Sequence, residues 1–169
     1  MTTSNPRPSR VSSTWLFAVW LVFAALLPHA AIAQAATQGL SDTDKQQIKD
    51  YNLNEDVFGR LLAATKEART QGIHSQANPD PSKVHSLDDL ATQAMAGDPR
   101  IAPLIKKYGF TPREFMLANI ALVNAAIVVQ SRNDPAMSKS IDQSKVNMAN
   151  VAFYESHQEQ IAALMRGDK

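Results

Sequence analysis

The stretch TPREFMLANIALVNAAIVVQS, residues 111–131, decides the fold. Thr111 and Glu114 form a capping box, with proline at the first helical position, and this combination is a strong signal for the start of a helix. The 17 residues that end at Ser131 carry no charge, and 13 of them are apolar. A helix that is apolar on nearly every side is either a membrane span or the central helix of a bundle.

Two features favour the bundle over the membrane span. Asn119 and Asn124 interrupt the apolar run, and the run is shorter than the roughly 20 apolar residues that a bilayer requires. We therefore predict an all-α fold, a compact bundle of about five to seven helices around a central apolar helix at about 112–131. This single helical domain is expected to cover residues 41–169.

The residues on either side of this stretch contain further helix starts and stops. Asn, Asp and Ser are preferred N-caps, and glycine often ends a helix in the left-handed conformation. An N-cap followed by proline, as in Asp98-Pro99, also restarts a helix. The expected starts are Ser41, Asn54, Ser86 and Asp98, and the expected stops are Tyr51, Gly72, Gly97 and Gly109.

Two regions are less regular. Residues 73–85 contain Pro79 and Pro81, so we expect one long irregular connection there. A final helical region is expected from about Ser138 to Arg166. The pattern Ser156-x-x-Glu159 is itself a capping box, so this region is either one continuous helix or two helices that meet near Ser156.

The N-terminal region predicts export. Its only charged residues are Arg7 and Arg10, and thirteen uninterrupted apolar residues follow at 15–27, ahead of the small-x-small site Ala31-Ile32-Ala33. These are the three parts of a secretory signal peptide, and the apolar core is too short for a stable membrane span. We predict that residues 1–33 are a signal peptide, with cleavage after Ala33 or alternatively after Ala35. Residues 34–40 then form a flexible leader.

Charge and cysteine content exclude several classes of protein. The whole chain has a formal charge of +1. Loss of the signal peptide removes two arginines and no acidic residue, which leaves −1. Neither value suits a nucleic-acid-binding protein. The chain has no cysteine, so it has no disulfide, thiolate nucleophile or covalent haem site.

His157 is the most notable titratable candidate for a functional site. In a continuous last helix it lies between Phe153 and Ile161 in one i, i+4 row, where a partly buried imidazole can act as a pH sensor, a general base or a metal ligand. If Ser156 starts a new helix, His157 lies instead in the exposed first turn. The neighbouring Glu155 and Glu159 point to other faces and cannot share a metal with it.

Three other groups are weaker candidates. His74 and His85 bracket the proline-containing connection and, with Asp80, offer ligands for a divalent metal, but their spacing matches no defined metal motif. Asn119 and Asn124 require partners inside a core. They either form hydrogen bonds between helices or line a ligand pocket, and because they diverge by about 140° they are not expected to serve one site.

Motifs for a nucleophile, a phosphate-binding loop or a metal centre are absent from the sequence, so no cofactor or metal is predicted. We expect a periplasmic or secreted, non-enzymatic protein that binds a protein, an envelope component or a small ligand. Nucleic acid is not an expected partner, and no stable membrane span is expected after signal cleavage. The alternative is a small envelope enzyme or metal-dependent protein that uses His157 or the His74/His85 loop.

The order of these features resembles a group of small uncharacterised exported bacterial proteins. The resemblance implies an exported, mainly helical domain from a Gram-negative-type bacterium, and it implies no activity, cofactor or catalytic residue. Its segments are Leu40-Ser41, Tyr51-Asn52-Leu53, Ser86-Leu87-Asp88-Asp89-Leu90, Pro103-Leu104, Gly109-Phe110-Thr111-Pro112-Arg113-Glu114-Phe115 and Asn150-Val151-Ala152-Phe153.

Overall fold

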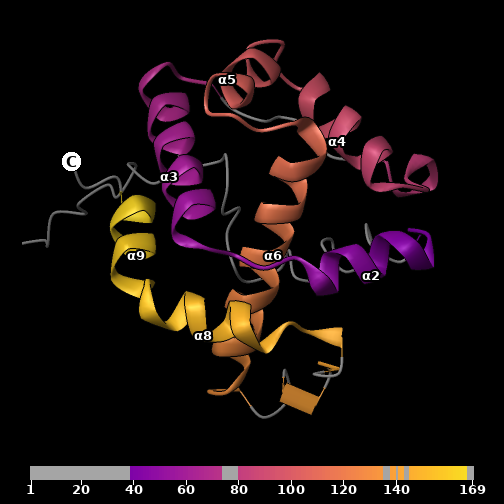
Figure 1. Ribbon diagram of the computed structural model, residues 1–169, viewed down its shortest axis with the longest axis vertical. Helices are drawn as coiled ribbons and strands as arrows, with labels where there is room; N and C mark the ends of the chain where they lie inside the picture. The colour runs from indigo at the N-terminus through magenta and orange to yellow at the C-terminus, as the bar shows by residue number, and fades with distance from the viewer. Residues whose placement is uncertain (1–38, 74–79, 135–137, 140, 143–144, 167–169) are drawn as a thin grey trace, which may run out of the picture.

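A computed structural model describes the chain over residues 39–73, 80–134, 138–139, 141–142 and 145–166, with the backbone alone for 164–166. In these ranges it contains seven α-helices, one 3-10 helix and no strand (Figure 1). The prediction of an all-α class is thereby confirmed for the described residues. The predicted signal peptide and most of the leader lie outside them.

The helices follow the chain in a simple order. Their bounds are α2 Asp42–Asp50, α3 Glu55–Thr70, the 3-10 helix η1 Pro81–Lys83, α4 Leu87–Ala96, α5 Ile101–Lys107, α6 Pro112–Ser131, α8 Met148–Ser156 and α9 Gln158–Arg166. The 3-10 helix lies in the segment 73–85 that was expected to be irregular throughout.

Most of the predicted helix ends are confirmed. The side chains of Ser41, Asn54, Ser86 and Thr111 each accept a hydrogen bond from the backbone N–H three residues later. Glycines at two stops adopt the left-handed conformation, with φ of 60° at Gly72 and 75° at Gly109. These caps satisfy backbone groups that a helix end would otherwise leave without partners.

The start of α5 differs from the prediction. The helix begins at Ile101, and Arg100 occupies the N-cap position without a side-chain capping bond. Asp98 instead accepts a hydrogen bond from the Arg100 N–H, which is two residues away. This local bond closes a turn ahead of the helix, as Asp side chains commonly do. Gly97 ends α4 in the right-handed region, with φ of −67°.

The C-terminal region is helical at residues 138–139 and continues, after a break, in two further helices. Asn147 caps α8, which begins at Met148. The chain bends at His157, which separates α8 from α9. The alternative with two helices is therefore confirmed.

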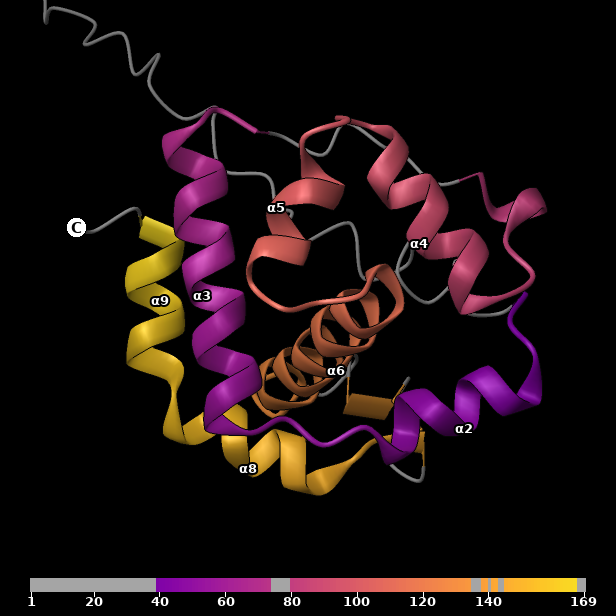
Figure 2. The same ribbon diagram turned by 45° about the horizontal axis from the view of Figure 1, so that its top comes forward.

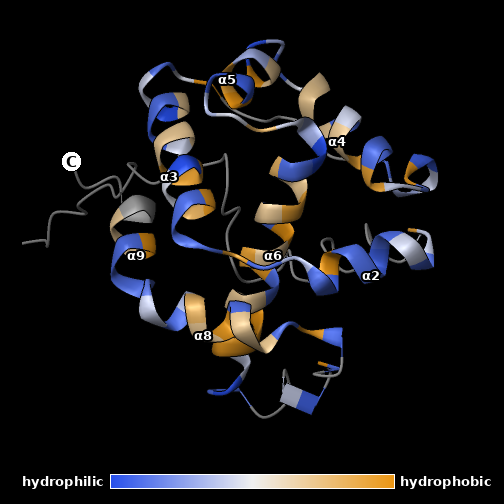
Figure 3. Ribbon diagram, viewed as in Figure 1, coloured by the Kyte–Doolittle hydropathy of each residue, from blue (hydrophilic) through white to orange (hydrophobic). Residues whose placement is uncertain are grey.

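The apolar helix α6 contacts α2, α3, α4, α5 and α8. Figure 2 looks nearly along α6 and shows the other helices around it, and Figure 3 shows apolar residues along most of its length. Ala118, Ala125 and Ala126 have no exposed surface. By length and composition α6 is also the one helix of the described chain that could cross a membrane, but half of its apolar window is buried in the protein, and a core helix meets the same criterion.

A second, smaller apolar cluster packs on the side of α6 near α2 and α4. It comprises Leu40, Ile48, Val84, Leu87 and Leu90, with Met116, Leu117 and Ile120 of α6 packed against it. Two of its members are surprising from the sequence. Val84 belongs to the proline-containing connection, and Leu40 belongs to the segment that was expected to be a flexible leader, yet they are 0% and 3% exposed.

Arg60 of α3 joins the end of α5 to the start of α6. Its guanidinium group donates to the carbonyl oxygen of Gly109, at 3.1 Å, and to the Glu114 carboxylate, at 3.0 Å. The same group lies 4.3 Å from the centroid of the Phe110 ring. One cation thus satisfies a carbonyl after α5 and an acidic residue in the first turn of α6.

Asn150 of α8 fixes the extended linker between α2 and α3. Its side-chain oxygen accepts from the Leu53 N–H at 2.8 Å, and its side-chain nitrogen donates to the Tyr51 carbonyl oxygen at 2.7 Å. Asn150 is only 3% exposed. The amide therefore pairs with the linker backbone as a neighbouring strand would, and it leaves neither backbone group without a partner.

Replacing Asn150 by alanine is expected to lower the free energy of unfolding by about 2 kcal/mol, because the buried Leu53 N–H loses its acceptor and the Tyr51 carbonyl oxygen keeps only its bond from Asn147. Urea unfolding followed by circular dichroism measures the change. Asn133→Ala, at an exposed position after α6, is the matched control and should change the stability by less than about 0.5 kcal/mol. Equal effects of the two substitutions would contradict the assigned role of Asn150.

Candidate functional site

His157 lies at the corner between α8 and α9, and its side chain is 11% exposed. The imidazole stacks on the ring of Phe153, with centroids 4.1 Å apart, and meets the edge of Phe58 of α3 at 4.9 Å. The imidazole therefore lies against two aromatic residues of different helices, Phe153 of α8 and Phe58 of α3.

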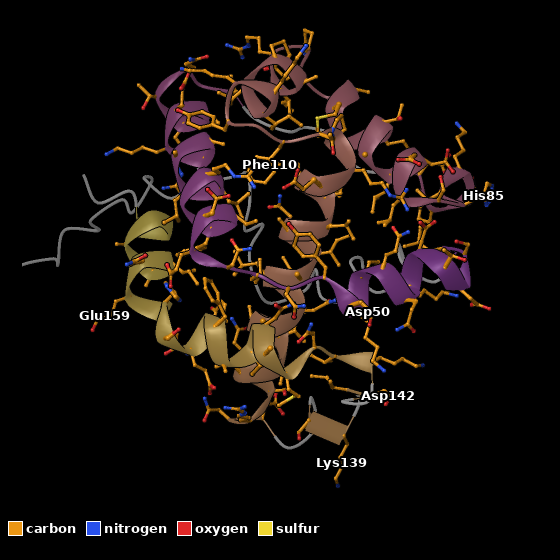
Figure 4. The ribbon with its side chains drawn as sticks, viewed as in Figure 1. Asp50, His85, Phe110, Lys139, Asp142 and Glu159 are labelled. Atoms are coloured by element: carbon orange, nitrogen blue, oxygen red, sulfur yellow. The ribbon has the colours of Figure 1, made fainter. Side chains whose placement is uncertain are left out.

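Both ring nitrogens of His157 have partners. Nδ1 is 2.8 Å from the carbonyl oxygen of Phe153 and 2.9 Å from the Ser156 hydroxyl. Nε2 is 3.0 Å from the nearer carboxylate oxygen of Glu55, at the start of α3. Glu155, by contrast, pairs with Arg132, and Glu159 is exposed and projects outward from α9 (Figure 4).

Neither geometry predicted for His157 is correct in full. The helix breaks next to Ser156, which excludes the continuous i, i+4 row. The imidazole is nevertheless largely covered, because the bend at the end of α8 turns it toward α3 and not toward solvent. Its acidic partner, Glu55, is 102 residues away in the sequence, and no sequence pattern connects the two.

Asn119 of α6 forms its side-chain hydrogen bond within its own helix. Asn119 donates to the carbonyl oxygen of Phe115 in its own helix at 2.7 Å, so this bond does not join two helices. Both Asn119 and Asn124 are half-buried. Neither lines the depression described below.

The proposed histidine loop is only partly described. His74 lies outside the described residues, and His85 is exposed. The Asp80 side chain caps η1 by accepting from the Ser82 backbone. In the part of the chain that the structure covers, no group of three or more His, Asp or Glu side chains is placed to hold a metal ion.

An open depression lies between α2 and α6, and the surface that lines it is mostly apolar. Asp42, Gln46 and Asp50 are spaced by four residues and form one row along α2. Asp50 stands at the end of α2 that approaches α6 (Figure 4). The full lining consists of Asp42, Thr43, Gln46, Gln47, Asp50, Tyr51 and Leu117. Tyr51 and Leu117 are the apolar members of this lining. Of the two carboxylates, Asp50 accepts from Gln46 and Asp42 pairs with the exposed Lys45.

A buried ion pair positions α2 beside this depression. The Asp44 side chain is 7% exposed and accepts hydrogen bonds from the Arg113 guanidinium group, the Ser41 hydroxyl and the Leu87 N–H. Arg113 also donates to Gln47, which lines the depression. One carboxylate therefore joins the first turns of α2, α4 and α6.

The hydrogen bonds at Asp44 outweigh the effect of its burial. Burial alone would raise the pKa of this carboxyl group. The bonds from Arg113, Ser41 and the Leu87 N–H together hold the pKa below its ordinary value of 3.8. Asp44 is therefore ionised at neutral pH and attracts the guanidinium group in that state.

The residues of the depression and of the buried pair were not recognised as functional in the sequence. Asp44 lies in the first turn of α2, where an acidic side chain also suits the helix dipole. The i, i+4, i+8 spacing of Asp42, Gln46 and Asp50 was a usable signal for one polar face of α2. No comparable signal placed Leu117 of α6 opposite that face.

Comparison with protein-family models, with curated proteins and with solved structures finds no match for this chain. The resemblance to small exported bacterial proteins therefore stays a prediction.

Replacing Asp44 by asparagine is expected to lower the free energy of unfolding by about 2 kcal/mol at neutral pH, because Arg113 loses a buried ionic partner. The lowered pKa means that the native carboxylate contributes stability above pH 3.8 and that this contribution disappears as the pH falls through the lowered value. The difference in the free energy of unfolding between Asp44→Asn and the unmodified chain should therefore become smaller toward about pH 3. Urea unfolding at both pH values measures it.

Asp88→Asn provides the control, because Asp88 pairs with the same Arg113 but its side chain is 70% exposed. Asp88→Asn should lower the free energy of unfolding by less than about 0.5 kcal/mol. A difference for Asp44→Asn that is equally large at acidic and neutral pH would contradict the assignment.

Proposed function

We propose that this chain is an exported, non-enzymatic binding protein. In this proposal residues 1–33 are a cleaved signal peptide, and the domain that remains is a compact helical bundle around α6 in the periplasm or outside the cell. The residue pattern at 1–33 supports export. The contacts that α6 makes with α2, α3, α4, α5 and α8 support the bundle.

The observation that carries the binding function is the depression between α2 and α6. Its floor is mostly apolar, and its charged lining residues, Asp42 and Asp50, are both acidic. Apolar lining with a few placed polar groups is typical of ligand sites. The complementary ligand is a short, basic and partly apolar peptide segment of a partner protein, whose cations meet the carboxylates while its apolar side chains cover Tyr51 and Leu117.

The alternative, a small enzyme or metal-dependent protein, draws less support from the geometry. Both nitrogens of His157 lie against groups of the protein itself. A catalytic or metal-binding imidazole needs at least one nitrogen directed toward its substrate or metal. We therefore place the site at the depression and not at His157.

Export is tested by the N-terminus of the mature protein. Mass spectrometry of the chain isolated from the envelope or medium of an expressing Gram-negative host should find an N-terminus at Gln34, or at Ala36 if cleavage follows Ala35. Recovery of the chain with residues 15–27 intact and bound to membranes would contradict the proposal.

Binding is tested with a fluorescein-labelled amphipathic peptide of lysine and leucine, followed by fluorescence anisotropy. Asp50→Lys should weaken its binding by about tenfold, because a cation replaces a carboxylate at the site. Glu159→Lys makes the same charge change on exposed α9 and should leave the affinity unchanged. The same peptide with glutamate in place of lysine should not bind. Equal losses for the two variants, or equal binding of the two peptides, would contradict the proposed site.

A further inference from the structure

One helix of this chain has, on its exposed side, the chemistry that the depression between α2 and α6 requires of a ligand. The helix is α5, whose sequence IAPLIKK contains two lysines and no acidic residue. Among the α-helices that the structure describes, it is the one that carries cations without a carboxylate. α5 is therefore the helix best matched in charge to the acidic lining of the depression.

The exposed side of α5 combines its two cations with small apolar groups. Lys106 and Lys107 are both exposed. Ala102 and Pro103 are exposed too, and each lies four residues before one of the lysines. Residues four apart on a helix are neighbours on one face. This face is therefore short, basic and partly apolar, as proposed for the ligand of the depression.

Charges of opposite sign stand without an ionic partner on the two surfaces. Lys107 is bound by Glu67 at 2.6 Å, whereas Lys106 forms no ion pair with any residue that the structure describes. On α2, the Asp50 carboxylate accepts from the neutral amide of Gln46. A contact between Lys106 and Asp50 thus pairs two charges that have no counterion in the described part of one copy.

The two surfaces also match in length. Asp42 and Asp50, which both line the depression, are eight residues apart on α2, or about 12 Å along the helix axis. The seven residues of α5 extend over about 10 Å. α5 can therefore lie along this row of α2, with Lys106 at Asp50 and its small apolar groups over the apolar residues of the lining.

α5 and the depression belong to different parts of one molecule. Figures 1 and 2 both show α5 apart from α2. The buried residues Ile101, Leu104 and Ile105 fix α5 to the main core, and Ile48 fixes α2 to the smaller cluster. The α5 helix of one copy therefore does not reach its own depression, and a contact between the two surfaces joins two copies of the chain.

We propose that the partner of the depression is a second copy of this chain, which contributes its α5. This inference rests on the proposed binding site and identifies its occupant. Because the contact is small and its charges are exposed, the association is weak and salt-dependent, with a Kd of about 0.1–1 mM.

The test measures self-association of residues 34–169, which contain the whole described fold, by sedimentation equilibrium at low salt. The unmodified chain should form species larger than the monomer as its concentration rises to about 1 mM. Lys106→Asp and Asp50→Lys should each weaken this association about tenfold, because each sets like charges against one another. Lys139→Asp makes the same charge change as Lys106→Asp, on an exposed residue at the end of the molecule opposite α5 (Figures 1 and 4), and should leave the association unchanged.

Exchange of the two charges distinguishes a direct contact from a general effect of charge. The double variant that combines Asp50→Lys with Lys106→Asp carries the same pair in reverse. In an equal mixture of the two single variants, Lys106 of one meets Asp50 of the other. Both samples should recover most of the association of the unmodified chain. Association that is absent up to about 1 mM, that either single variant leaves unchanged, or that the exchange fails to restore would overturn the proposal.

A salt series on the unmodified chain needs no substitution. Salt screens exposed charges, so about 0.5 M sodium chloride should weaken the association. Association that is equal or stronger at high salt would overturn the pairing of Lys106 with Asp50.

The result also separates this inference from the function that it extends. Binding of the lysine and leucine peptide at Asp50 by a chain that stays monomeric would overturn the second copy as the occupant, and the proposed function would stand. Loss of both peptide binding and self-association would overturn both.

Discussion

The apolar helix α6 has to be shielded from water, and the rest of the described structure buries about half of its apolar window. Burial of apolar surface stabilises a protein by roughly 25 cal/mol for each Å² removed from water. A helix without a polar face therefore has to be covered from several directions. Five other helices contact α6, and its alanines at 118, 125 and 126 are fully buried. The helices α2, α3 and α4 are amphipathic for the complementary reason, since each has one side to bury.

Polar side chains determine where these covering helices begin and how they meet. Asp44 joins the first turns of α2, α4 and α6. Arg60 joins the end of α5 to the start of α6, and Asn150 holds the linker between α2 and α3. All three act at helix ends or on a linker, where backbone groups lack partners in their own helix. Apolar burial alone leaves the helices free to slide, whereas these contacts select one arrangement.

The local signals in the sequence predicted most of the helices, because a cap acts over three or four residues. Ser41, Asn54, Ser86 and Thr111 all start helices as expected. At Asp98 a tight turn competed with the helix for the same side chain, and the helix began two residues after Pro99. Such local signals could not predict the contacts between residues of the candidate sites. Glu55 and His157, or Gln47 and Arg113, are brought together by packing, and a single sequence contains no direct record of which distant residues meet.

The two hydrogen bonds from Asn150 to the linker between α2 and α3 also constrain the order in which the chain can fold. The Leu53 N–H and its acceptor on Asn150 are 97 residues apart. Contacts between distant residues require a large loop to close first, and they slow folding. The linker near the beginning of the domain therefore stays without its buried partner until almost the whole chain has been synthesised. The cover that α8 gives to α6 is likewise completed only when the chain beyond residue 147 is present.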